Sequence, residues 1–253
     1  MKPSLRSEVP PFYVMEVMRA AEAREQAGHR VLHLEVGQPS TPAPAAVLTA
    51  ARRALDHDRL GYTGAAGLVP LRDRIARWYH DRYDLTIERD QIVVTTGASG
   101  SCVLAFLAAF DPGQRVGVLA PGYPCYRNDL LAFGIDVVEI EVGPETDFRP
   151  TTEQLDGAGH LDGLVIASPS NPTGTVLDDR QLAELCQWAG ARGVRLLADE
   201  IYHGITYDEP APSVLAHADD VIVLNSFSKY FSMTGWRLGW VVAPPAMAEA
   251  IER

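Results

Sequence analysis

Lys229 is the side chain best suited to covalent chemistry, because it is one of only two lysines in the chain. The other is Lys2, and arginine accounts for the rest of the 22 basic residues. Lys229 lies in a Ser-rich turn after the apolar run 221–225, with Arg237 eight residues further on. A lysine in a cleft beside a second cation loses its proton readily, and the free amine can attack a carbonyl carbon to form a Schiff base.

The neighbours of Lys229 favour a cleft over a solvated loop, which is the usual setting of a lysine. Ser226, Ser228 and Arg237 supply the donors and the positive charge that bind a phosphate group. A second candidate is the segment 95–101, where a small-residue turn leads from an apolar strand into an apolar helix. Backbone N–H groups at such a helix start bind anions. The pattern G-x-G-x-x-G is absent, so a dinucleotide site is not predicted.

Asp199 and Glu200 follow the apolar run 194–198 and place two carboxylates at the end of a strand. One interpretation is the magnesium site of a nucleotide hydrolase, but that site also needs a Gly-Lys pair, which the chain lacks. A carboxylate in this place can instead pair with a protonated ring nitrogen of a cofactor. The alternative for Asp199 taken alone is a helix cap or an internal ion pair.

Asn171 and Tyr123 follow two further apolar runs. Asn171 lies in the turn Ala167-Ser-Pro-Ser-Asn171-Pro-Thr-Gly174, whose dipeptides are typical of a turn without any other role. Its position nevertheless directs the amide toward the edge that carries Asp199 and Lys229. Tyr123 could stack on a flat ring, although core packing is the commoner role of tyrosine.

The elements that must position these residues are short strands alternating with helices. Three helical segments, 99–110, 123–133 and 178–192, lie among seven runs rich in Val, Ile and Leu: 92–96, 115–119, 135–142, 164–167, 194–198, 221–225 and 238–243. This alternation predicts an α/β fold with three layers (α/β/α) and a mainly parallel seven-stranded sheet. Ligands of such sheets bind at the carboxyl ends of the strands. Before residue 90 the patterns predict helices at 12–27, 44–57 and 68–83 and a strand at 31–36.

Composition and charge narrow the classes of partner. Hydrophobic residues make up 47% and charged residues 22%, as in ordinary globular proteins, and the net charge of −11 argues against nucleic acid or an anionic membrane. The first 11 residues lack the apolar core of a signal peptide, and the longest apolar run, 103–110, is too short to span a bilayer. The three cysteines are widely spaced, which indicates neither a disulfide framework nor a metal cluster. We therefore expect a cytoplasmic protein without a metal.

Three motifs, in their order and separation, match a known family. They are Asn171-Pro-Thr-Gly174, Asp199-Glu-Ile-Tyr202 and Ser226-x-Ser-Lys229-x-x-x-Met-x-Gly-x-Arg237. From about residue 12 to its last residue, the sequence resembles the fold-type I pyridoxal-phosphate enzymes, specifically the class I/II aminotransferases typified by aspartate aminotransferase. The resemblance implies pyridoxal 5′-phosphate as cofactor and transfer of an amino group between an L-amino acid and a 2-oxo acid.

The resemblance also implies roles for individual residues. Lys229 would form the imine with the cofactor and move a proton between the substrate Cα and C4′ of the cofactor. Asp199 would hold the pyridinium, while Tyr202 and Asn171 would hydrogen-bond the phenolic oxygen, and Tyr123 would stack on the ring. The implied phosphate ligands are the backbone amides of Ala98 and Ser99 with the side chains of Ser226 and Arg237.

Two N-terminal motifs imply contacts with substrate and with a second subunit. The turn Gly61-Tyr62-Thr-Gly-Ala-Ala-Gly67 matches one whose tyrosine reaches the phosphate of the neighbouring subunit, which implies a homodimer with shared active sites. Gly37, in Val36-Gly-Gln-Pro39, matches the substrate-contact loop, and Asn171 would also contact substrate. We expect residues 1–45 to belong to the small domain and dimer arm, and residues 46–253 to form the cofactor-binding large domain.

The resemblance further implies that a smaller C-terminal domain is missing after Arg253. That domain supplies the arginine that binds the substrate α-carboxylate, so we expect cofactor binding to survive and efficient transamination to be lost. Two other hypotheses remain open: a lyase with the same cofactor and fold, and a non-catalytic module that binds the cofactor or dimerises. No particular amino acid is predicted as substrate, since selectivity depends on variable loops.

Overall fold

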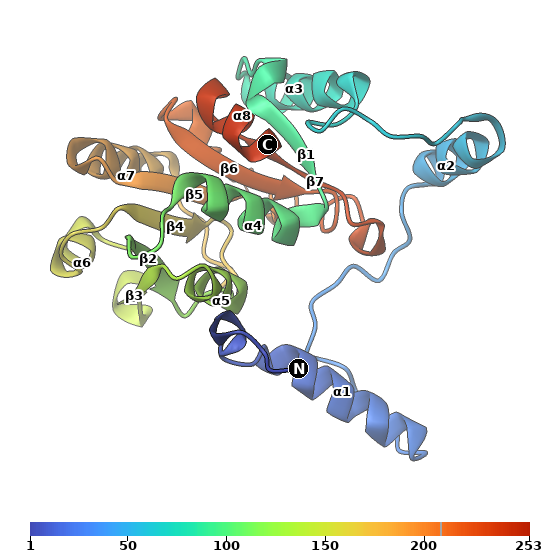
Figure 1. Ribbon diagram of the computed structural model, residues 1–253, viewed down its shortest axis with the longest axis horizontal. Helices are drawn as coiled ribbons and strands as arrows, with labels where there is room; N and C mark the ends of the chain where they lie inside the picture. Colours follow the sequence, from blue (N-terminus) through green and yellow to red (C-terminus); the bar gives the residue numbers. More distant parts are fainter. Residues whose placement is uncertain (208) are drawn as a thin grey trace.

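A single mixed sheet organises the protein, as a computed structural model that describes residues 1–207 and 209–253 shows. Within these residues, seven strands lie in the order β1-β7-β6-β5-β4-β2-β3 (Figure 1). The strands are β1 (Ile92–Thr95), β2 (Arg115–Ala120), β3 (Asp136–Glu141), β4 (Gly163–Ala167), β5 (Arg195–Asp199), β6 (Val221–Ser226) and β7 (Gly239–Val242). The α-helices are α1 (Tyr13–Gln26), α2 (Ala45–His57), α3 (Val69–Tyr83), α4 (Gly97–Ala109), α5 (Pro124–Ala132), α6 (Thr152–Gly157), α7 (Asp179–Arg192) and α8 (Pro245–Glu252).

The strand register brings the carboxyl ends of the parallel strands to one edge. Strands β3, β2, β4, β5 and β6 are parallel neighbours, and Ala167 of β4 lies opposite Asp199 of β5. Strand β7 is antiparallel to both β6 and β1. The predicted mainly parallel seven-stranded sheet is confirmed, and each predicted strand end lies within one residue of the observed one.

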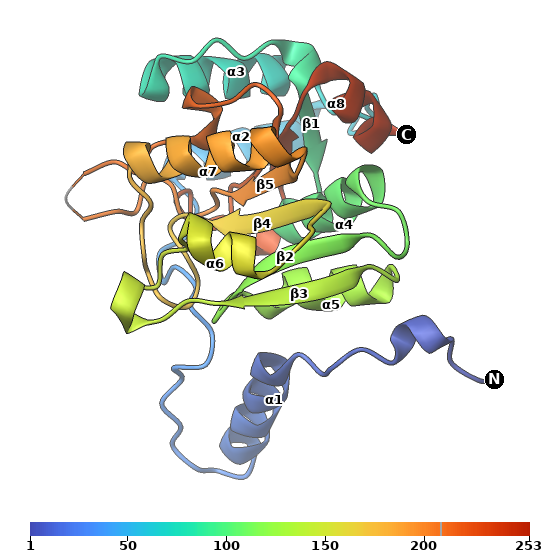
Figure 2. The same cartoon turned by 90° about the vertical axis from the view of Figure 1, so that its left-hand side faces the viewer.

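Helices cover both faces of the sheet (Figure 2), which explains why its strands are apolar on both sides. Helices α3, α6 and α7 pack on one face through residues such as Tyr79, Leu155 and Leu185. Helices α4, α5 and α8 pack on the other through residues such as Phe106 and Leu130. The predicted three-layer arrangement is confirmed.

The N-terminal helices lie apart from the layers that pack on the sheet. Helix α1 projects from the body of the molecule in both views and helix α2 in Figure 1 (Figures 1 and 2), and between them they bury only Ala21. The six predicted helices are confirmed within two residues at either end, whereas the short helix α6 was not predicted. Among the described residues, no helix combines the length and apolar character needed to cross a membrane.

The predicted strand at 31–36 is wrong. Those residues form no strand, and the apolar side chains of Leu32 and Leu34 are 77% and 93% exposed. An extended segment becomes a strand only when a neighbour satisfies its backbone N–H and C=O groups. No described strand lies beside residues 31–36, because the sheet ends at β1 and β3. The alternating pattern of side chains was therefore not enough to form a strand in this chain.

One carboxyl group lies inside the core, directly after β5. Glu200 is only 2% exposed, and its oxygens accept hydrogen bonds from the Ser213 hydroxyl (2.9 Å) and the Val214 N–H (2.8 Å). Burial raises the pKa of Glu200 from 4.5 to about 8, and the neighbouring Asp199 adds to the rise. Glu200 therefore keeps its proton in the folded protein at pH values where the unfolded chain has lost it.

We expect Leu164→Ala to lower the free energy of unfolding by about 2–5 kcal/mol, because it opens a cavity at the centre of the sheet. Leu164 is fully buried in β4. The control is Leu131→Ala in α5, where the side chain is 40% exposed and the loss should stay below about 1 kcal/mol. Urea unfolding followed by circular dichroism measures both, and equal losses would contradict the assignment of the core.

We expect the wild type to lose stability relative to Glu200→Gln as pH rises from about 4.5 to about 8. The pKa of Glu200 is raised in the folded state, so the unfolded chain loses its proton first and rising pH favours unfolding over this window. Glutamine accepts the same hydrogen bonds but does not titrate. Denaturant unfolding of both proteins at several pH values in the window gives the difference, which would be constant if Glu200 ionised normally.

Candidate active site

Candidate functional residues from four strand ends come together at the carboxyl edge of the parallel strands. Tyr123 follows β2, Asn171 follows β4, Asp199 ends β5 and Lys229 follows β6. Strands β3 and β4 lie on opposite sides of β2. The connection after β2 therefore leads to one side of it, and the chain then crosses back to place β4 on the other side. Connections that diverge at such a point leave a crevice for a ligand.

Lys229 is half-buried and lies over the edge of the sheet rather than in bulk solvent. Its Nζ donates a hydrogen bond to the Gly37 carbonyl at 2.7 Å and lies 5.7 Å from the centre of the Tyr202 ring. Burial lowers the pKa of Lys229 from its ordinary value of 10.5, and the negative charge of Asp199 partly opposes this. The environment therefore favours the neutral, nucleophilic amine more than solvent does.

Asp199 is a buried carboxylate to which the described residues bring no paired counter-charge. Its Oδ2 accepts a hydrogen bond from the Tyr126 hydroxyl at 2.5 Å, and its Oδ1 accepts one from the Ile201 N–H at 3.0 Å. Burial raises the pKa of Asp199, while Tyr126, Ile201 and Lys229 lower it in part. Within the described residues Asp199 takes part in no ion pair. Such a carboxylate is suited to a cationic group that enters from outside.

The start of α4, with Arg237 and β7 packed beside it, forms a candidate recess for an anion. Gly97 has φ +83°, and a Cβ placed on it would come within 2.5 Å of Nη2 of Arg237, so the missing side chain leaves room for the guanidinium. Arg237 Nη1 also donates to the Thr234 carbonyl at 2.9 Å. A Cβ on Gly239 would lie 2.8 Å from the carbonyl carbon of Gly97, which shows how closely β7 approaches this helix start. The first N–H groups of a helix have no partner within it, and with Arg237 beside them they suit a phosphate group.

Ser226 shapes the turn that carries Lys229. Its side chain is buried, and its hydroxyl contacts Ser228 Oγ at 2.8 Å and the Leu238 carbonyl at 3.1 Å. The Ser228 N–H donates back to Ser226 Oγ at 3.0 Å. Of the predicted phosphate ligands, the structure brings Arg237 to the helix start that carries Ala98 and Ser99, whereas the Ser226 hydroxyl lies within its own turn.

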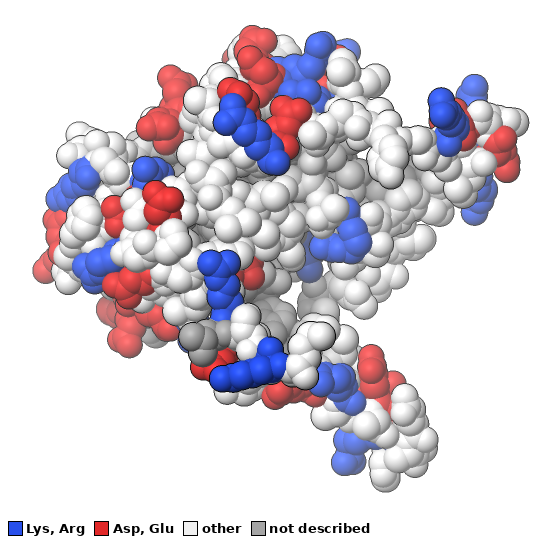
Figure 3. Space-filling model, viewed as in Figure 1, with Lys and Arg blue, Asp and Glu red and all other residues white. Residues whose placement is uncertain are grey.

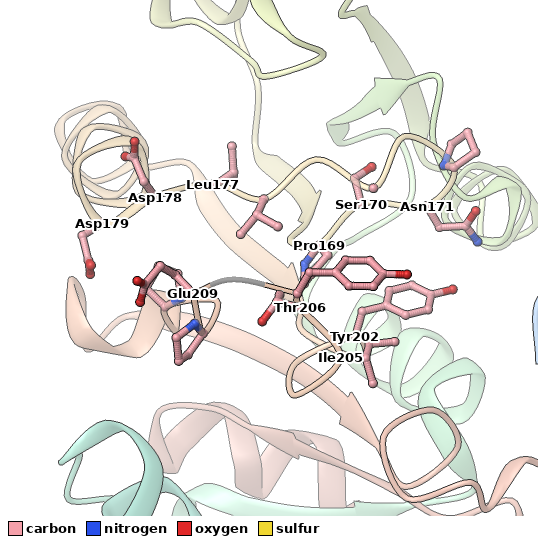
Figure 4. A pocket seen from close by; sticks show the side chains of 16 residues that line it. Pro169, Ser170, Asn171, Leu177, Asp178, Asp179, Tyr202, Ile205, Thr206 and Glu209 are labelled. Atoms are coloured by element: carbon pink, nitrogen blue, oxygen red, sulfur yellow. The ribbon is translucent and has the colours of Figure 1, made fainter. Parts of the chain in front are cut away.

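Asn171 and Tyr202 line a groove of about 770 Å³ between the loop after β4 and the turn after β5. Figure 4 shows both side chains at the same end of this groove. Burial raises the pKa of the Tyr202 phenol, and the Asn171 side chain partly offsets the rise. Lys229 does not line the groove, but its amine lies above the Tyr202 ring, so the groove adjoins the Lys229 site.

Tyr123 forms an aromatic wall with two other rings. Its ring makes edge-to-face contacts with Tyr126 (centroids 5.4 Å apart) and with Phe12 (5.8 Å). Tyr126 was not predicted as a site residue, although it is the hydroxyl partner of Asp199. The signal was present in the sequence, because residues three apart at the start of a helix lie on one face, and Tyr126 follows Tyr123 at that spacing.

The two N-terminal candidates lie in different places. Gly37 is at the site, where its carbonyl accepts the hydrogen bond from Lys229, and the nearby hydroxyls of Thr41 and Ser232 are 2.8 Å apart. Tyr62 is fully exposed, so a contact with the phosphate of a second subunit stays a prediction. On the face drawn in Figure 3, acidic and basic side chains are interspersed rather than gathered into one charged patch.

Comparisons with known proteins agree with this geometry. The sequence model of the family described as "Aminotransferase class I and II" matches residues 29–253. The chain is 48% identical over 252 residues to the valine–pyruvate aminotransferase of Mycobacterium tuberculosis, covering 98% of this chain and 65% of that protein. It is 34% identical to the aspartate aminotransferase of Thermotoga maritima, covering 98% of this chain and 67% of the relative.

Solved structures show the same relationship. The aspartate aminotransferase of Thermus thermophilus with maleate superimposes with a TM-score of 0.96 at 31% identity, covering 100% of this chain and 67% of that one. The chain therefore spans about two thirds of the length of the relatives that it matches. The match along nearly its whole length, together with the site at the strand ends, places the chain in the class I and II aminotransferase family, whose members use pyridoxal phosphate.

Proposed function

We propose that the protein is a pyridoxal-phosphate-dependent aminotransferase that moves an amino group between an L-amino acid and a 2-oxo acid. The observation that carries the proposal is that Lys229 and Asp199 both lie at the carboxyl edge of the parallel strands. A half-buried amine and a fully buried carboxylate without an ion-pair partner among the described residues stand at the edge where ligands of this fold bind. Family membership supports the same reaction.

The residues present fit the cofactor. Its phosphate group matches the recess at the start of α4, where Gly97 leaves the space that the Arg237 guanidinium occupies. Its ring nitrogen, when protonated, supplies the positive charge that buried Asp199 lacks. Its ring needs an aromatic face, for which Tyr123 is the candidate. A ligand lacking any of these three features would leave part of the site unmatched.

When bound, pyridoxal phosphate supplies an electron-accepting ring that stabilises negative charge on the substrate Cα. The Asp199 carboxylate, which the hydrogen bond from Tyr126 fixes in place, would keep the ring nitrogen protonated. Lys229 would take the proton from the substrate Cα and return it to C4′ of the cofactor, because it is the one lysine at the site and its pKa is lowered. Tyr202 and Asn171 would donate hydrogen bonds to the phenolic oxygen, and the amides of Ala98 and Ser99 with Arg237 would hold the phosphate. Ser226, whose hydroxyl binds Ser228 and the Leu238 carbonyl in the protein alone, would have to turn that hydroxyl to the phosphate to join them.

The assembly that we propose is a homodimer of a cytoplasmic enzyme. The fully exposed Tyr62 is available to reach the phosphate of a second subunit, and Gly37 is placed to contact substrate beside Lys229. Residues 1–45 would belong to the small domain and dimer arm, which agrees with the small contact of α1 with the sheet domain. Residues 46–253 would form the large domain. The three cysteines are free, as a reducing compartment requires.

The substrates that we propose to test first are valine and alanine with their 2-oxo acids. The relative with 48% identity is named for valine and pyruvate, while four relatives with 33–35% identity are named for aspartate and others in that range for different substrates. Release of ammonia together with the 2-oxo acid would instead identify the lyase reaction. Cofactor binding without any 2-oxo acid would identify a non-catalytic module.

Pyridoxal phosphate added to the protein should produce a visible absorption band, and borohydride should then attach the cofactor covalently to Lys229. The reason is that Lys229 is the one amine beside the recess for the phosphate group. Absorption spectra and peptide mass analysis check this in the wild type, in Lys229→Ala, and in the control Lys2→Ala. The band should vanish only in Lys229→Ala; a band that persists there, or a label on another residue, would reject the proposal.

Asp199→Asn should slow single-turnover release of the 2-oxo acid by at least about 100-fold, as expected when a buried group that stabilises developing charge is lost. The amide can still accept the hydrogen bond from Tyr126, so the fold should be kept. The matched control is Asp136→Asn, an exposed carboxylate in a surface ion pair with Arg115 at the opposite end of the strands. Rapid-quench measurement with valine tests both, and equal rates for the two variants would exclude a role for Asp199.

A further inference from the structure

His203 is a buried residue that none of the proposed catalytic steps uses. It lies directly after Tyr202 and is 3% exposed. Its Nε2 is 2.9 Å from the Ser168 carbonyl and its Nδ1 is 2.7 Å from the Tyr83 hydroxyl. A carbonyl can only accept a hydrogen bond, so Nε2 carries the proton, and Nδ1 of the neutral ring accepts the proton of Tyr83.

The surroundings of His203 keep the ring neutral. Burial lowers the pKa of His203 to about 4, with the charge of Arg82 adding to the decrease and the Ser168 carbonyl opposing it. Glu200 lies 3.6 Å from Nδ1, but it accepts its hydrogen bonds from Ser213 and Val214, and its raised pKa keeps it protonated. Both nitrogens of His203 are thus satisfied by one fixed tautomer.

Ser168 is the anchor of the loop that carries Asn171. Its N–H donates to the Asp199 carbonyl at 3.1 Å, and its side-chain oxygen accepts from the Leu177 N–H at 3.0 Å, which closes the loop from residue 168 to residue 177. Inside the loop, the Gly174 N–H donates to the Ser170 carbonyl at 2.8 Å. The His203 bond to Ser168 therefore joins this closed loop to the turn that contains Tyr202.

Tyr83 ties the same ring to a third element. Tyr83 is the last residue of α3, and its ring packs edge-to-face against Trp78 within the core on that face of the sheet. Through Nδ1 the imidazole is thereby held against a helix that takes no part in the site. One side chain connects the Asn171 loop, the Tyr202 turn and the rigid layer of α3.

We propose that His203 is a positioning residue, which holds the Asn171 loop against the Tyr202 turn so that the amide and the phenol meet on one atom of the cofactor. The proposal rests on the proposed function for the identity of that atom, the phenolic oxygen. The geometric part stands without it, because the joint between the two segments exists in the protein alone.

Two substitutions separate the contacts of His203. In His203→Gln the side-chain amide nitrogen occupies the place of Nε2 and can still donate to the Ser168 carbonyl. In His203→Asn the shorter side chain can keep an acceptor for Tyr83 near the place of Nδ1 but no longer reaches Ser168.

Two further variants complete the set. Tyr83→Phe keeps His203 but removes the hydroxyl that binds its Nδ1, and it remains informative if either His203 variant fails to fold. Trp188→Phe is the control for loss of a hydrogen bond elsewhere, the partly buried one from Trp188 to Asp156 at 2.8 Å.

The first measurement is hydrogen exchange of the Gly174 and Leu177 amides in the cofactor-free protein. His203→Asn should speed their exchange by roughly tenfold, the effect of losing a hydrogen bond that held the loop closed. His203→Gln and Trp188→Phe should stay within about threefold of wild type, and Tyr83→Phe should fall between. Unchanged exchange in both His203→Asn and Tyr83→Phe would overturn the positioning role, whether or not the protein binds pyridoxal phosphate.

The second measurement is titration with pyridoxal phosphate, followed by the pH dependence of the visible band. His203→Asn should weaken binding roughly tenfold and move the midpoint of the band to higher pH by about half a unit, because donors to the phenolic oxygen stabilise its charge after a proton is lost. His203→Gln should restore both values. If the wild type does not bind pyridoxal phosphate, the proposed function is rejected and the exchange measurement alone decides whether His203 positions the loop. If all variants bind normally with equal midpoints, His203 has no role at the cofactor.

Discussion

The parallel register of β4, β5 and β6 is the constraint on which the site depends. It sets Ala167 opposite Asp199, so the segments after these strands emerge side by side at one edge. Because side chains alternate along a strand, it also decides which carboxylate goes where. Asp199 lies on the face of α5 and meets Tyr126, whereas Glu200 turns to the opposite side and meets Ser213. A shift by one residue would exchange the places of the two carboxylates and turn Asp199 away from Tyr126.

Burial then gives otherwise ordinary groups their chemical character. Asp199 has no counter-charge among the described residues, Lys229 is half-buried with a lowered pKa, and Arg237 stands at a helix start where positive potential already collects. Asp199 forms no ion pair with either cation among the described residues. Groups left unpaired in this way suit a ligand that brings a cation, a carbonyl carbon and a phosphate, and the packed layers around them hold them in place.

Much of the fold was predictable from local patterns, and the places of the site residues after the strands followed from it, while their roles stay predictions. The runs of Val, Ile and Leu located the strands within one residue, since burial on both faces of the inner strands leaves little other composition possible. The strand at 31–36 was wrong because pairing depends on a neighbour that no local pattern reveals. His203 was missed for a related reason: it acts through a contact with a residue far along the chain, Ser168. For Tyr126 the spacing from Tyr123 indicated the shared helix face, but not that its hydroxyl partner would be Asp199. Long-range partners of polar groups are set by packing, which sequence spacing does not encode.

The close packing of Gly97, Gly239 and Arg237 restricts which substitutions this part of the protein can accept. Gly97 faces the Arg237 guanidinium and Gly239 faces the backbone of Asn225 and Gly97, so neither glycine can gain a methyl group without displacing backbone or guanidinium. Substitutions that alter the site at lower structural cost are therefore to be sought in the loops after β4 and β5, and the crowded start of α4 is the part of the site least open to remodelling.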